Sequence, residues 1–246
     1  MRSMKLKPLF LSWLGASLFL TGVLMGLALS GGVLWGEIES SIYSSLSGSA
    51  RLRVSCPLML SPAESGTIRS DFTNPTDEEI KPVILAEITK KSGAQILSQT
   101  LYLAPGETQT IEWSVDASDV IFDKLILVSI LQSQYRETPS RLGTCGVLFF
   151  GLFGLTGMQT FSLIFAASVI CIFLGSGLWY HARKPLEKLA LNVAQAGSLL
   201  AVTVVCGLFS SLPRWWGLTL ILDGLSVLIM GIIVIEFLLF PQRYRD

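Results

Sequence analysis

Asp223 is the side chain whose type and position most directly suggest chemistry. It lies in a long apolar run, seven residues after Trp216, or about 10 Å along a helix. A carboxylate inside a bilayer costs about 3 kcal/mol on insertion scales, so it must be protonated, paired or directed at a polar interior. The sequence therefore leaves two alternatives, a proton or ion relay (or a contact to a partner's basic residue) and an interhelical hydrogen bond.

Few polar residues near the apolar runs could be hydrogen-bond partners of Asp223. The candidates are Arg214, Thr203, Ser198, Gln159 and Thr160. We also expect Asn192 and Gln195 to face the same interior as further intramembrane polar residues. One polar residue per helix is typical of hydrogen bonds between membrane helices, whereas a relay needs several in line.

Cys56 and Cys145 flank a polar stretch that we expect on an oxidising side of a membrane, where thiols pair. A disulfide between them closes a loop of about 90 residues, worth about 4 to 5 kcal/mol in the chain-entropy description. In a reducing compartment they would be two unpaired buried thiols. Cys171 and Cys206 lie in apolar runs and are expected to pack as small apolar groups.

Other chemistry has little support in the sequence. The single histidine, His181, cannot form a metal-ligand cluster, a Ser-His-Asp triad or a bis-histidine haem site. An acidic turn at residues 71–79 lacks the spacing of an EF-hand and is expected to be solvated. We therefore expect no catalytic site, no cofactor and no bound metal, and the lack of a basic run argues against nucleic acid as a partner.

Four apolar runs are long enough to cross a bilayer, which takes about 20 helical residues. Only 15% of the 246 residues are charged, against about 25% in soluble domains. We expect an N-terminal tail and first membrane helix over residues 1–36. The other membrane helices are expected at 158–180, 189–212 and 217–240, followed by a cytoplasmic tail at 241–246.

Lysine and arginine cluster on one side of these predicted helices. They lie in the N-terminal tail, the turn after residue 180 and the C-terminal tail. Because cytoplasmic loops carry such residues, both termini are expected in the cytoplasm and residues 37–157 outside it, in a plasma membrane, most simply a bacterial one. Small residues mark expected packing faces of the helices: Gly22 and Gly26 in the first, and Gly217, Gly224 and Gly231, seven apart, in the last.

Residues 37–142 differ in composition and period from the rest. They contain 14 of the 18 acidic and nine of the 18 basic residues. From residue 51 to about 135, apolar residues alternate with polar ones between turn residues, which predicts short strands and an all-β sandwich of the immunoglobulin kind. The expected strands are 51–56, 66–72, 83–89, 96–103, 108–115 and 125–132.

Two turns give this stretch a resemblance to a known family. Phe72-Thr-Asn-Pro-Thr-Asp77, followed by Leu103-Ala-Pro-Gly-Glu-Thr108, resembles the bacterial Ig-like modules of the CARDB type. The resemblance covers residues 51–142. It implies a β-sandwich with a binding or spacing role and no active site.

The junctions with the membrane helices have less regular patterns. Residues 143–157 are apolar, and with the next run, to residue 180, they make 38 residues without a charge, about 57 Å as one helix. Glycines divide this run, so we expect a re-entrant or interfacial segment at 143–157 with its phenylalanines in lipid, or else one strongly tilted helix. After Trp35, Ile38 and Ile42 recur at helical spacing, which suits either a short amphipathic stalk or a serine-rich linker.

The expected fold is thus a four-helix membrane bundle with one Ig-like domain inserted between the first and second helices. We expect a non-catalytic protein that presents this domain for interaction, as an accessory or assembly subunit of a membrane complex. Its partners would be membrane lipid and other membrane subunits or an extracellular protein. The alternative is a proton- or ion-coupled transport component that uses Asp223.

Overall fold

The computed structural model describes residues 8–91, 93–136, 138–183 and 188–239. The chain divides into two compact units. One is formed by Met1–Gly31 together with Ser162–Asp246, and the other by Gly32–Phe161. The predicted cytoplasmic tail at 241–246 lies outside the described residues.

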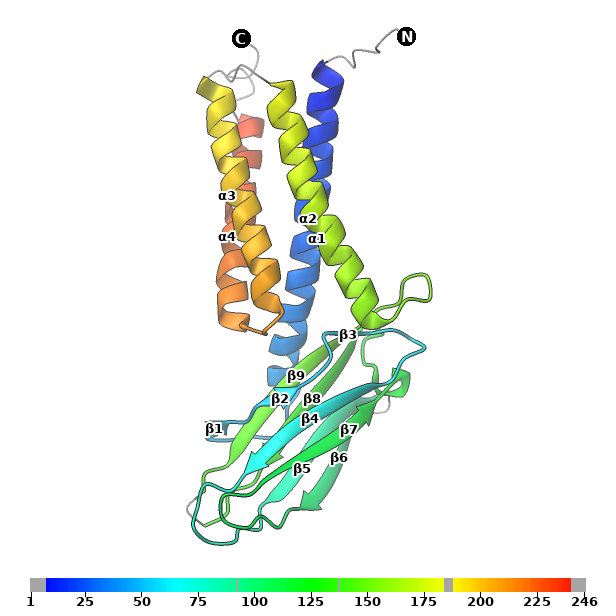
Figure 1. Ribbon diagram of the computed structural model, residues 1–246, viewed down its shortest axis with the longest axis vertical. Coiled ribbons are helices and arrows are strands. Elements are labelled where there is room, and N and C mark those ends of the chain that lie inside the picture. Colours follow the sequence, from blue (N-terminus) through cyan, green and yellow to red (C-terminus); the bar gives the residue numbers. More distant parts are fainter. Residues whose placement is uncertain (1–7, 92, 137, 184–187, 240–246) are drawn as a thin grey trace. The chain divides into compact units, whose positions relative to one another are not determined.

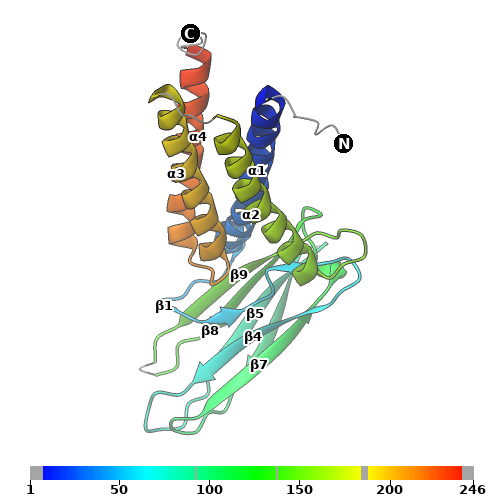
Figure 2. The ribbon, with the colours of Figure 1, turned by 45° about the horizontal axis from the view of Figure 1, so that its top comes forward.

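The first unit is helical. The helices of the chain are α1 (Pro8–Tyr43), α2 (Gly157–Ala182), α3 (Lys188–Ser211) and α4 (Trp216–Leu239). All four are long and apolar enough to cross a membrane, as predicted. A tight turn joins α3 to α4, and these two helices run side by side (Figures 1 and 2).

Small residues let α1 approach its neighbours closely. A Cβ atom placed on Gly22 would lie 2.8 Å from the backbone oxygen of Ser168 on α2. One placed on Gly26 would lie 2.7 Å from a methyl group of Val204 on α3. Ser168 also donates a hydrogen bond of 2.8 Å to the carbonyl oxygen of Gly22. These contacts need residues without side chains, and this explains the glycine spacing in α1.

The second unit contains two β-sheets. Its strands are β1 (Ala50–Arg51), β2 (Val54–Ser55), β3 (Met59–Leu60), β4 (Gly66–Thr73), β5 (Val83–Lys90), β6 (Gly93–Thr100), β7 (Thr108–Val115), β8 (Leu125–Gln132) and β9 (Arg141–Phe149). The larger sheet has the order β1-β9-β8-β5-β6, with β3 also paired to β9, and the smaller has the order β2-β4-β7. Figures 1 and 2 show β4 and β7 side by side in one layer, so the unit is sandwich-like.

The core of this unit lies between the two sheets. Alternate residues of β4 and β7 point inward and meet alternate residues of β5, β8 and β9, as the period of two requires. Phe72 and Ile68 on β4 and Ile126 and Ile130 on β8 are fully buried. The ranges predicted from the period-two pattern agree closely with β4, β5, β7 and β8, whereas β6 begins three residues before the predicted 96–103.

The larger sheet is also covered on its other face. The last turns of α1, which belong to this unit, lie against it at Gly36, where the backbone approaches Gly146 of β9 directly. Ser41 contacts Thr144 of β9 through their hydroxyl groups, 3.3 Å apart. As a result β8 is buried along nearly its whole length, on both faces.

The strand β9, which lies under the end of α1, corrects the prediction for residues 143–157. The prediction of a re-entrant or interfacial segment is wrong for residues 143–149, which belong to β9 and pair with β8 in register from Gly143 to Leu148. A strand buried on both faces reads as a continuous apolar run, and that run resembles a membrane segment. The first helix likewise continues to Tyr43, beyond the expected boundary at 36, and its last turns are helical instead of a linker.

The start of α2 is fixed to the sandwich. Thr156 and Gln159 form a capping box, in which each side chain bonds the other's backbone N–H group. Glu64, between β3 and β4, accepts hydrogen bonds from the N–H groups of Gly157 (2.7 Å) and Ser61 (3.2 Å). A carboxylate at a helix N-terminus is favourable because it satisfies a free N–H group and faces the positive end of the helix dipole.

Candidate functional site

Among the residues of the helical unit whose burial the structure describes, one carboxyl group is buried. Asp223 on α4 is 9% exposed, and its Oδ1 atom accepts a hydrogen bond of 3.0 Å from Ser30 on α1. The Ser30 hydroxyl lies equally close, 3.0 Å, to the carbonyl oxygen of Gly26, so its single hydrogen can serve only one acceptor at a time. The Oδ2 atom of Asp223 has no hydrogen-bond partner within the described residues.

The site also depends on a glycine. A Cβ atom on Gly207 of α3 would lie 2.8 Å from Oδ1 of Asp223. Gly207 therefore leaves the space that the carboxyl group occupies between α3, α4 and α1. Gly207 could not be identified from the sequence, because an isolated glycine in an apolar run does not indicate which residue lies opposite it.

Hydroxyl pairs lie on either side of Asp223 along the α3–α4 contact. Ser226 donates a hydrogen bond of 2.8 Å to Thr203, and the hydroxyls of Ser210 and Thr219 are 2.8 Å apart. All four residues are buried. Each hydroxyl also lies within hydrogen-bond distance of the carbonyl oxygen of a residue three or four earlier in the sequence. The single hydrogen of each hydroxyl therefore has an acceptor, either across the pair or on the backbone.

The described hydrogen bonds of Asp223 and of several polar residues named from the sequence differ from the prediction. Thr203 bonds Ser226 and not Asp223. Asn192 and Gln195, expected to face the interior, lie on exposed positions of α3, and Gln159 is exposed in the capping box of α2. The actual hydrogen-bond partner, Ser30 on α1, was not among the candidates predicted from the sequence.

The glycines of α4 have a different environment from those of α1. Within the described residues, nothing lies within 4 Å of a Cβ atom placed on Gly217, Gly224 or Gly231. The predicted seam is therefore not occupied by another helix of this chain. Lipid or a helix of another protein would contact it if α4 crosses a membrane.

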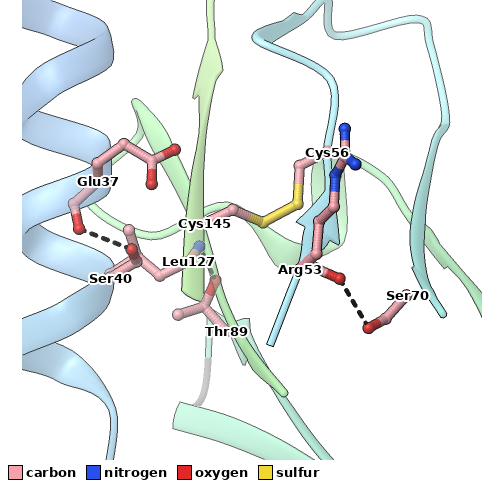
Figure 3. Close-up of a disulfide and its surroundings, with 8 residues drawn as sticks. All are labelled: Glu37, Ser40, Arg53, Cys56, Ser70, Thr89, Leu127 and Cys145. Atoms are coloured by element: carbon pink, nitrogen blue, oxygen red, sulfur yellow. Dashed lines mark hydrogen bonds between the residues drawn. A yellow bond between two sulfur atoms is a disulfide. The ribbon is translucent and has the colours of Figure 1, made fainter. Parts of the chain in front are cut away.

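A disulfide links Cys56 and Cys145 in the sandwich (Figure 3). Their Cα atoms are 6.6 Å apart, and 89 residues separate them in sequence. Cys145 is fully buried, and its side chain leaves β9 on the face opposite to α1, with Glu37 and Ser40 on the other side (Figure 3). The bond ties the segment after β2 to β9 and thereby closes the sandwich.

The two turns that carry the family resemblance meet at Asn74. Its Nδ2 atom donates to the carbonyl oxygens of Glu78, Leu103 and Ala104 at 2.7 to 3.0 Å, and its Oδ1 atom accepts from the backbone and hydroxyl of Thr76. The side chain is fully buried. The motif is therefore a structural link between the turns and not a ligand site. Within the described residues, no group of three or more His, Cys, Asp or Glu side chains could hold a metal ion.

The sandwich presents one unusual edge. Every residue of β6 is exposed, and β6 ends the larger sheet, so one of its edges has no neighbouring strand among the described residues. Its sequence, GAQILSQT, has no charge and no proline. Ile96 and Leu97 are 55% and 38% exposed. Edge strands are usually protected by charges, prolines or bulges, and β6 has none of the first two.

No protein-family model matches this sequence, and no curated protein matches it either. Several solved structures resemble part of the chain. A β-glucosidase from Listeria innocua, in complex with gluconolactone, matches 44% of this chain and 17% of its own length, at 17% identity and a TM-score of 0.33. Red sea bream transglutaminase matches 42% of this chain and 15% of its own, at 17% identity and a TM-score of 0.33.

A CARDB domain from Pyrococcus furiosus, in complex with two metal ions, is also similar. It matches 42% of this chain over 93% of its own length, at 8% identity and a TM-score of 0.31. A CARDB domain is thus among the structural neighbours, at a low level of similarity. The chain spans less than a fifth of the two enzymes, and likenesses this weak indicate neither an activity nor a ligand.

Proposed function

We propose that this protein is a non-catalytic, membrane-anchored interaction protein, an accessory or assembly subunit of a larger membrane complex. Its four helices cross a lipid bilayer, and its sandwich-like, Ig-like domain lies outside the cytoplasm. The domain offers β6 as a docking edge for an extended segment of a partner protein. The observation that carries the proposal is the open, uncharged edge of β6.

The helix lengths support the membrane part of this proposal. At 36 residues, α1 is about 54 Å long, well beyond a hydrocarbon core of about 30 Å. Its residues from Gly32 on belong to the sandwich unit, and the remaining residues 8–31 would extend about 36 Å, which suits a bilayer. The basic residues in both tails and in the turn between α2 and α3 favour cytoplasmic termini.

The composition of β6 supports a protein strand as the occupant of its edge. In an antiparallel ladder alternate residues bond each neighbour, so about half of the eight β6 residues direct N–H and C=O groups away from β5. An added strand would satisfy these groups and cover Ile96 and Leu97, the mode of recognition known as β-augmentation. The other long strand without charge, β8, is buried in the middle of the sheet.

Site-specific photo-crosslinking in native membranes tests this function. A photoreactive amino acid replaces Leu97 of β6, and a matched variant carries it at Thr67, which is exposed on the central strand β4. We expect a discrete adduct with another membrane or extracellular protein from position 97 and none from position 67. The proposal would be contradicted if position 97 forms adducts only with a second copy of this chain. It would also be contradicted if no adduct forms and the protein is a lone monomer after mild solubilisation.

A second candidate function, proton- or ion-coupled transport, rests on the Oδ2 atom of Asp223, which has no partner within the described residues. Asp223→Asn keeps the shape of the side chain and an oxygen for Ser30, but it cannot carry a proton or a negative charge. If the carboxyl group only joins helices, this variant keeps the complex and its function intact. Loss of function in a folded, correctly assembled Asp223→Asn protein would favour transport instead.

A further inference from the structure

Three phenylalanine side chains are exposed at one end of the sandwich. Phe122, Phe150 and Phe153 are 60%, 49% and 92% exposed. We call them the phenylalanine tip. Such large apolar side chains on a domain surface indicate a contact that the isolated chain does not provide.

The three residues come from neighbouring segments. Phe122 lies in the tight turn that leads into β8, and the first residue of β8, Leu125, pairs with Leu148 near the end of β9. The N–H group of Phe149 donates to the carbonyl oxygen of Lys124 at 2.7 Å. The turn before β8 and the segment after β9 are therefore fixed side by side at this end of the sheet.

Two of these phenylalanines have a backbone conformation that costs free energy. Phe122 has a φ of 54° and Phe153 a φ of 50°, both in the left-handed region. For a residue with a side chain this region costs about 1 kcal/mol or more. No packing within the domain compensates for it at Phe153, because that ring is almost fully exposed. The strain therefore suggests that an outside partner covers the ring.

The sequence around the tip identifies the partner. No charged residue occurs from Gly143 to Tyr180, and α2 begins at Gly157, four residues after Phe153. Phenylalanine is well suited to the boundary between headgroups and acyl chains, and Asp123 and Lys124, both exposed beside Phe122, suit the headgroup layer.

From these observations we infer that the phenylalanine tip inserts into the interfacial layer of the bilayer that α2 crosses, so that the lipid surface is a ligand of the sandwich. This inference rests on the proposed membrane crossing. Part of the interfacial segment predicted from the sequence is thus kept: the residues after Phe149 contact lipid, and Phe122 from another turn joins them.

Depth-dependent quenching of a fluorescent label tests the inference in the full chain. The free thiols are first removed by Cys171→Ala and Cys206→Ala, while the Cys56–Cys145 disulfide stays in place. Phe153→Cys and Phe122→Cys are then introduced one at a time and labelled with an environment-sensitive dye. The labelled protein is placed in phosphatidylcholine vesicles. Tyr102→Cys, on a sandwich residue about as exposed as Phe122, is the matched control, and Leu174→Cys, exposed on α2, reports the membrane crossing.

We expect shallow spin-labelled lipid to remove most of the emission at positions 153 and 122 and to leave position 102 unchanged. Position 174 should be quenched by the deep spin label. If position 174 is quenched but 153 and 122 behave like 102, the lipid contact of the tip is refuted while the membrane crossing stands. If position 174 is not quenched, the proposed membrane crossing itself fails.

Discussion

At the scale of single residues, Asn74 links the turns at residues 72–77 and 103–108. Its Nδ2 atom joins the two turns through the carbonyl oxygens of Leu103 and Ala104, and its Oδ1 atom accepts from Thr76 within the first turn. We predict that Asn74→Asp lowers the free energy of unfolding of the sandwich by about 2 to 3 kcal/mol, because three carbonyl oxygens lose their donor and a charge is buried. Asp77→Asn, exposed in the same turn, is the control and should change little. Thermal unfolding followed by circular dichroism measures both, and equal stabilities would refute this role.

Asp116 gives a prediction about pH. It caps the short helix at Ala117–Asp119, and the hydrogen bonds from the backbone N–H and the side chain of Ser118 hold the pKa of its carboxyl group below the usual 3.8. A lowered pKa in the folded state adds stability that is full above the usual pKa and is lost as the pH falls through the folded pKa.

The matched change is Asp116→Asn, which keeps the cap but does not titrate. We expect the stability difference between wild type and this variant to shrink as the pH falls from about 5 to about 3. Unfolding temperatures of both proteins along this pH series measure it. A difference that stays constant would show that the cap is not the titrating element.

Gly207 illustrates what the sequence does not reveal about the candidate site. Asp223 could be found from its type alone, because a carboxyl group in an apolar run is conspicuous. Ser30 and Gly207 could not, because the choice of partner depends on how three helices pack. We predict that Gly207→Ala is about 1 to 2 kcal/mol less stable than Gly197→Ala on the same helix, since only the first displaces Asp223 from Ser30. Thermal stability in detergent compares the two, and indistinguishable values would contradict the packing around Asp223.

At the scale of elements, the strands and the helices differ in how far the sequence predicts them. Strands with one buried face, such as β4 and β7, show the period of two and are found almost to the residue. The four long apolar helices are found from length and composition. β9 is missed because the end of α1 covers its second face, and this removes the polar alternation that identifies a strand. The cover depends on a contact distant in sequence, which no local pattern records.

The two glycines at the contact between α1 and β9 differ in the room that they leave for a side chain. A Cβ atom on Gly36 would lie 3.4 Å from Gly146, an ordinary contact, whereas one on Gly146 would overlap the backbone of Gly36. Gly146→Ala should therefore push α1 away from the sheet and cost about 3 kcal/mol or more, while Gly36→Ala should be tolerated. Hydrogen exchange at β8 and β9 measures the effect. Equal protection in the two variants would mean that α1 does not cover β9 in this way.

At the scale of the whole molecule, both α1 and α2 belong to two units. The last turns of α1 and the first turn of α2 are part of the sandwich unit, and the rest of each helix belongs to the helical unit. Within the sandwich unit, the end of α1 packs against β9 at Gly146, and the N–H group of Gly157 at the start of α2 donates to the carboxylate of Glu64. These contacts fix to the sandwich the parts of both helices that belong to that unit.

The disulfide tests the proposed location and the stability of this unit together. It encloses nearly the whole sandwich, so the joint change Cys56→Ser and Cys145→Ser should lower the unfolding free energy of the unit by about 3 to 5 kcal/mol, whereas Cys171→Ser should change it little. Disulfides persist in oxidising compartments. In intact membranes prepared with a thiol block, Cys56 and Cys145 should therefore resist alkylation until a reductant is added. Ready alkylation of both without reductant would place the sandwich in a reducing compartment and reverse the proposed topology.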